Sequence, residues 1–89
     1  MATVEFTPNL SRQTTAVRCE APGNTVAEVL ATVFDQVPTL KGYLVDDQGA
    51  VRQHVVIFLD GIAIKDRRHL TDPTQPESEI FVMQALSGG

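Results

Sequence analysis

The chain has 89 residues, of which 43% are hydrophobic and 20% are charged, with seven basic and eleven acidic side chains and a formal net charge of −4. This length allows one domain with one core, because domains below about 50 residues rarely fold alone. The basic residues are scattered, which argues against a nucleic-acid binder, since such proteins concentrate basic side chains on one face.

Features that would direct the chain to a membrane or an oxidising compartment are not expected. The longest apolar run, from Val55 to Leu59, is five residues, against about 20 for a transmembrane helix. No basic and apolar leader precedes the first strand-like segment, so we expect no signal peptide. A single cysteine, Cys19, excludes an internal disulfide. The sequence therefore predicts a cytoplasmic protein without membrane contact.

The first part of the chain has the pattern of a strand hairpin. Apolar and polar side chains alternate over residues 2–7, with Val4 and Phe6 on one side, and this pattern predicts a strand. Residues 15–19 alternate again after a short connection, so an antiparallel hairpin is the economical interpretation. Residues 21–24, which include a proline and a glycine, then break the chain.

The strongest periodic signal predicts a helix that begins after Thr25. Thr25 and Glu28 have the spacing of a capping box, in which the hydroxyl accepts from the backbone of Glu28 and the carboxylate reaches back. Pro38 predicts the end of the helix, because a residue before proline is pushed out of the α region. The apolar positions form one stripe at helical spacing: Val26, Val29, Leu30, Val33, Phe34 and Val37.

The second half of the chain predicts three more strands. Residues 39–52 are less regular, with a turn at 46–49 in which Gly49 supplies a positive φ. Residues 54–59 are apolar on both faces, as in a central strand, and Asp60 and Gly61 turn the chain into a short strand over 62–64. After a polar segment, residues 80–86 form the last strand. Four side chains of the irregular segment are expected to cover an edge of the core: Leu40, Tyr43, Leu44 and Val45.

This order of elements predicts an α+β fold. One main helix would pack on one face of a mixed sheet of four to five strands. An initial hairpin, a single helix and a last strand that returns to the centre of the sheet suggest a β-grasp, the ubiquitin-like fold. We expect one domain over residues 1–86 and a flexible tail at 87–89.

Side chains suited to catalysis or to metal binding are few. His54 and His69 form no spaced ligand set with Cys19 or a carboxylate, so both are expected to be structural or exposed. Cys19 takes a second-strand core position, where a free cysteine behaves as a small apolar group. Asp46 and Asp47 have the pattern of a solvated turn. The sequence predicts no metal site, no cofactor bound by the chain itself and no enzyme.

The candidate functional element is the sequence Leu86-Ser87-Gly88-Gly89 directly after the last strand. Two residues without Cβ atoms make a narrow tail that can enter a tight channel and lie beside a nucleotide. Four extended residues reach roughly 13 Å. We therefore expect the Gly89 carboxylate to be the reactive group, and the alternative is a frayed end without a function.

The sequence resembles a known family in its second half. Residues 80–89 are similar to the last strand and tail of the MoaD/ThiS sulfur-carrier proteins, which end in an apolar strand, an aliphatic residue, a small residue and Gly-Gly. Ser87 stands where alanine is common in this family, and its side chain is small enough to enter the same narrow channel. Residues 38–61 are similar to the branch with the mycobacterial cysteine-biosynthesis carrier, at Pro38, Leu40, Tyr43, Leu44, Asp46, Gly49, Arg52 and the run from His54 to Gly61.

The resemblance implies a carrier cycle. A ubiquitin-activating-type adenylating enzyme would use ATP and magnesium to turn the Gly89 carboxylate into an acyl-adenylate. Sulfur from a persulfide or sulfide donor would displace AMP and leave a thiocarboxylate on Gly89, with Gly88 keeping the approach clear. A sulfur-accepting biosynthetic enzyme would then take the sulfur. The resemblance does not decide which pathway receives the sulfur. The pathways left open are those of cysteine or methionine, molybdopterin, thiamine and siderophore-type products.

A partner-binding surface follows from strand alternation. If the set that includes Val55 and Ile57 faces the helix, the alternate apolar side chains point to the other side of the sheet: Val56, Phe58, Phe81 and Met83. An exposed apolar patch on a small domain marks a protein contact. The alternative is that residues 39–52 fold across this face. Leu86 and Ser87 are expected to guide the tail into a partner groove.

Two other functions stay open. A ubiquitin-like protein modifier would be joined through Gly89 to lysine amines, since an amine can intercept the same acyl-adenylate. A binding module with an inert tail, such as an assembly domain, would use the folded body alone.

Overall fold

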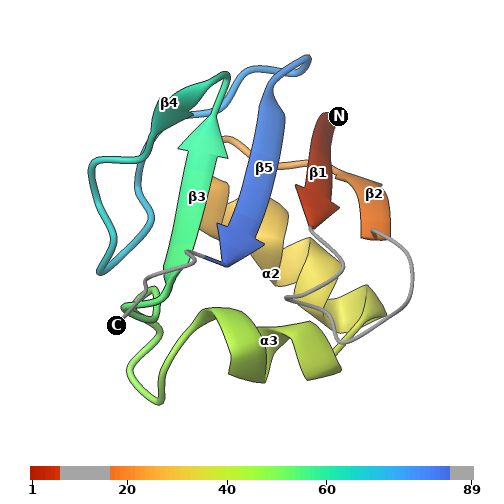
Figure 1. Ribbon diagram of the computed structural model, residues 1–89. Coiled ribbons are helices and arrows are strands. Elements are labelled where there is room, and N and C mark those ends of the chain that lie inside the picture. The colour runs from red at the N-terminus through yellow and green to blue at the C-terminus, as the bar shows by residue number, and fades with distance from the viewer. Residues whose placement is uncertain (7–16, 85–89) are drawn as a thin grey trace.

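The computed structural model describes residues 1–6 and 17–84 (Figure 1). Residues 7–16 and 85–89 lie outside the described part of the chain, and with them the predicted tail. Within that part, the elements in chain order are β1 (Ala2–Phe6), β2 (Val17–Ala21), α2 (Val26–Gln36), α3 (Thr39–Leu44), β3 (Val55–Leu59), β4 (Ile62–Ala63) and β5 (Glu79–Gln84).

The five strands form one mixed sheet in the order β2-β1-β5-β3-β4. β1 pairs with β2 as an antiparallel hairpin, as predicted. β5 lies at the centre, parallel to β1 and antiparallel to β3. The prediction that the last strand returns to the middle of the sheet is therefore confirmed, and the first and last strands of the described chain lie side by side (Figure 1).

The core lies between the sheet and α2, which covers one face (Figure 1). The sheet contributes alternate side chains of β1, β3 and β5, including Val4, Ile57 and Val82, all fully buried. Each such side chain contributes about 1.5–3 kcal/mol on burial. The helix contributes the predicted apolar stripe, in which four side chains are buried: Val26, Val29, Leu30 and Val33.

Both ends of α2 follow the local sequence. The Thr25 hydroxyl accepts from the Glu28 backbone N–H at 3.2 Å, and the Glu28 carboxylate accepts from the N–H of Asn24, one residue before the cap, at 3.0 Å. These bonds satisfy donors that have no partner inside a helix. α2 ends at Gln36, as expected from Pro38.

The segment expected to be irregular contains a second helix, α3, which periodicity missed because it has only six residues. Leu40 and Leu44, four residues apart, share one face and are buried, as predicted, and so is Val45. Tyr43 lies on another face and is 38% exposed, so the prediction that it covers the core was wrong.

Several strand limits differ from the predicted ones because pairing sets them. β2 continues to Ala21, where it pairs with Ala2 at the start of β1. β3 begins at Val55 and leaves the exposed His54 outside, and β4 has only two residues. The predicted turns are present: Asp60, Gly61 and Gly49 all have positive φ.

Candidate interaction surface

The face of the sheet opposite α2 carries the four predicted apolar side chains. Val55 and Ile57 on β3 are fully buried on the α2 side, so the alternate residues of that strand point the other way. The same alternation holds on β5, where Ile80 and Val82 are buried. Figure 1 looks onto this face, with the strands in front of α2.

Strand pairing joins the four side chains into one surface, which we call the sheet patch: Val56, Phe58, Phe81 and Met83. Val56 pairs with Met83, and Phe58 pairs with Phe81, as direct partners on β3 and β5. Directly opposed side chains on one face of a sheet contact each other. Phe81 is 37% exposed and the other three are half-buried. The sequence prediction that these residues share a face is confirmed.

Polar side chains flank the sheet patch on the β1 side. Glu5 is the neighbour of Phe81 across the parallel β1–β5 pair. Glu5 in turn lies opposite Arg18 on β2, and their side chains form an ion pair of 4.0 Å. Both are well exposed, so the pair adds little stability. The face thus has an apolar part and a charged border, which is the usual layout of a protein contact.

Residues 39–52 do not fold across the sheet patch. The buried side chains of α3, Leu40 and Leu44, belong to the core. Figure 1 shows α3 past the end of the sheet, and not in front of β3 and β5. The alternative that this segment covers the patch is therefore excluded.

Comparison with solved structures identifies the fold. A chain of the BexX/CysO complex of Amycolatopsis orientalis matches with a TM-score of 0.78, at 20% identity over all of both chains. CysO of Mycobacterium tuberculosis matches at 0.76, with 15% identity over 97% of this chain and all of that one. SAMP1 of Haloferax volcanii matches at 0.70, with 22% identity over 98% and 99%. The protein has the ubiquitin-like β-grasp fold. No protein-family model and no curated protein matches the sequence.

The sheet patch lies close in sequence to the predicted tail. β5, the central strand, runs to Gln84, and Met83 of the patch is its penultimate residue. Leu86, Ser87, Gly88 and Gly89 follow after Ala85 and lie outside the described residues. Two residues, Gln84 and Ala85, therefore separate the patch from the tail in the sequence.

The remaining chemical candidates have structural or exposed positions. Cys19 on β2 is half-buried and packs against the core, in line with the apolar role expected for it. His54 and His69 are exposed. The Asp46 carboxylate accepts from the backbone of its own turn, at 2.9 Å from the N of Gln48. Among residues 1–6 and 17–84, no three His, Cys, Asp or Glu side chains are grouped so that they could hold a metal ion.

Sequence reasoning missed the role of Asp66. Its carboxylate accepts from the Thr71 hydroxyl and from the backbone N–H groups of Arg68 and His69, and these bonds, led by that of Thr71, lower its pKa to about 2. The sequence signal for such an Asx turn is an aspartate at the start of a polar loop, and residues 66–71 have this pattern.

None of the helices in the described residues is long and apolar enough to cross a membrane.

Proposed function

We propose that the protein is a cytoplasmic sulfur carrier in which the Gly89 carboxylate is the working group. The support is the sheet patch, an apolar contact surface on a β-grasp body that continues within a few residues into a Gly-Gly sequence. The patch would dock on an adenylating enzyme of the ubiquitin-activating type. Six residues follow Met83 to the end of the given sequence, and they reach about 20 Å when extended.

The chemistry of the cycle divides between carrier and partners. The Gly89 carboxylate would attack the α-phosphorus of ATP bound with magnesium in the partner, and pyrophosphate would leave. Hydrosulfide would then attack the acyl carbon, AMP would leave with the electrons of the broken C–O bond, and a thiocarboxylate would remain. A persulfide donor would need a thiol to cleave the acyl disulfide that forms first. The carrier contributes its carboxylate and its docking surface, and the partner supplies the charge stabilisation.

A second function, conjugation to lysines through Gly89, is favoured by one observation. The fold is shared with the small archaeal modifier protein 1 of Haloferax volcanii, with a TM-score of 0.68 and 20% identity. An amine that attacks the same acyl-adenylate gives an amide and releases AMP. The two functions therefore share activation and differ in the nucleophile.

Activation is tested with the adenylating enzyme of the same organism. The chain, the enzyme, ATP and magnesium are mixed, and release of pyrophosphate is measured. We expect release that depends on the chain and that is lost when Gly89 is deleted. Phe81→Asp should raise the chain concentration needed for half-maximal release and leave the tail chemistry intact. Release from the chain without Gly89 at the same rate would overturn the proposal.

A further inference from the structure

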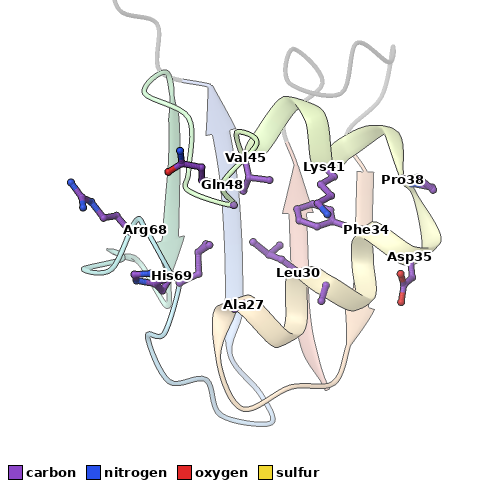
Figure 2. Close-up of a pocket in the computed structure, with 13 residues that line it drawn as sticks. Ala27, Leu30, Phe34, Asp35, Pro38, Lys41, Val45, Gln48, Arg68 and His69 are labelled. Atoms are coloured by element: carbon purple, nitrogen blue, oxygen red, sulfur yellow. The ribbon is translucent and has the colours of Figure 1, made fainter.

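A groove of about 490 Å³ lies on the α2 side of the sheet, opposite the sheet patch (Figure 2). It runs between α2, α3, the turn at 46–49 and the loop at 66–70. Its floor is apolar: Leu30, Val45 and Leu70 are 1%, 5% and 6% exposed. Phe34 of α2 forms part of its wall and is half-buried. The volume is that of a site for a few side chains of a ligand.

Basic side chains border the groove on two sides. Lys41 lies on the α3 side beside Phe34, and Arg68 and His69 lie on the loop side, with Leu30 and Val45 between them in Figure 2. Asp35 also lines the groove, and the picture places it on the far side of α2 from Arg68.

Lys41 and Arg68, the lysine and the arginine at the border, make no side-chain bonds that stabilise the described part of the fold. Within residues 1–6 and 17–84, Lys41 and Arg68 donate no side-chain hydrogen bond and form no ion pair. Arg67, the neighbour of Arg68, differs: its Nη2 donates to the backbone O of Arg52 and of Val55, both at 2.7 Å. The positive charge of Lys41 and Arg68 is thus available to a ligand.

Two acidic side chains of these loops, Asp46 and Asp66, are engaged within their own loops. Asp46 accepts from the N–H groups of Gln48 and Ala50 in its own turn, at 2.9 and 3.1 Å. Asp66 accepts from the N–H groups of Arg68 and His69 at 3.1 and 2.9 Å. These carboxylates fix the two loops that line the groove, and Arg68 and His69 belong to the loop that Asp66 fixes.

The base of the groove is also fixed. Leu70 has a φ of 54°, in the left-handed region that a residue with a Cβ rarely adopts. Its carbonyl accepts from the N–H of Ala27 in the first turn of α2 at 2.9 Å, and its N–H donates to the carbonyl of Asp66 at 3.0 Å. The surrounding bonds therefore hold a costly backbone conformation that aims the Leu70 side chain into the floor.

We propose that this groove binds a short acidic peptide segment of a partner protein. A bulky apolar side chain of the segment lies on Leu30, Phe34 and Leu70, and carboxylates on either side of it pair with Lys41 and with Arg68. An apolar floor between two separated positive borders calls for a ligand with two anionic groups and an apolar centre, which an extended acidic peptide supplies. The site goes beyond the proposed carrier function, and because it lies opposite the sheet patch, both surfaces can be occupied at once.

The test is an NMR titration of the ¹⁵N-labelled full chain with a capped pentapeptide, acetyl-Asp-Leu-Phe-Leu-Asp-amide. We expect saturable shifts at the backbone amides of Phe34, Lys41 and His69, with those of Val56 and Phe81 unmoved. The same peptide with lysine for aspartate is expected not to bind. Arg68→Glu should weaken binding by about tenfold, since the charge is reversed at the site.

Controls separate the site from general charge effects. Lys65→Glu makes the same charge change at an exposed position outside the groove and should leave the affinity within about twofold. Lys41→Glu provides a second border variant if Arg68→Glu melts at a lower temperature. The proposal is overturned if the lysine peptide binds equally, if the shifts do not saturate, or if they map to the sheet patch. Tighter binding of octanoate at the same amides would assign the groove to a small anion instead, and shifts that grow with chain concentration alone would assign it to a second copy.

Discussion

Phe58 on β3 and Phe81 on β5 lie directly opposite each other, on the face of the sheet that α2 does not cover. The antiparallel register of β3 and β5 places the two rings side by side although 22 residues separate them in the sequence. Val56 and Met83 form the next such pair two residues along each strand. The result is a compact apolar surface on one face of the sheet.

Phe81→Asp is expected to weaken binding to the adenylating enzyme by at least about tenfold while the free energy of unfolding falls by only about 1 kcal/mol. Phe81 is 37% exposed, so the fold loses little burial, but a charge at the centre of a contact must be desolvated. Calorimetric titration measures the binding and urea denaturation measures the stability.

Ile62→Asp is the matched control for this variant. Ile62 is also an exposed apolar residue, at 69%, but it lies on β4 outside the sheet patch. It should bind like the unchanged chain. Equal loss of binding in both variants would show that added charge is responsible, and a large loss of stability in Phe81→Asp would place the ring in the core.

Two glycine-to-alanine changes should shift stability in opposite directions. A Cβ at Gly23 would lie 2.7 Å from the backbone N of Val29 in α2, so Gly23→Ala should lower the free energy of unfolding by about 1–3 kcal/mol. A Cβ at Gly42 in α3 would meet nothing within 4 Å, and alanine favours a helix, so Gly42→Ala should raise it by about 0.5–1 kcal/mol. Urea denaturation checks both, and a shift of the same sign in both would contradict the packing described for α2.

The Asp66 carboxyl should stay ionised to about pH 2. Because its pKa is lowered from 3.8 by folding, its stabilisation is present above pH 3.8 and is lost as the pH falls through about 2. Asp66→Asn should therefore melt below the unchanged chain at neutral pH, and the difference should shrink as the solution is acidified across this range. Carboxyl ¹³C NMR measures the midpoint directly.

Asp47→Asn controls for the loss of one negative charge at a neighbouring exposed turn. It should melt close to the unchanged chain at neutral pH. An Asp66 titration midpoint at or above 3.8 would show that the loop bonds do not hold the ionised form.

The sequence predicted those parts of the molecule that long or strict periodicity encodes. The stripe from Val26 to Val33 identified α2 and its buried face, and alternation in β3 and β5 identified the sheet patch. α3 was missed because six residues carry too little periodicity and Gly42 interrupts them.

The groove was missed for a different reason. Its borders come from Lys41 and Arg68, which are 27 positions apart in the sequence and line the same groove only because of the packing of α3 and the loop at 66–70. Its walls depend on Asp66, whose engagement with its own loop is a matter of backbone geometry. The fold therefore brings these two basic residues to opposite borders of one groove.

The most direct test of the carrier function is intact mass spectrometry of the protein isolated from its native host. We predict a population with the mass gain of oxygen replaced by sulfur, located at Gly89 by fragmentation and missing in a strain without the adenylating enzyme. A ladder of conjugates linked through Gly-Gly to lysines would point to the modifier function instead. A tail that ends in an unchanged carboxylate under sulfur demand, or a mature chain that continues past Gly89 without processing, would contradict the account.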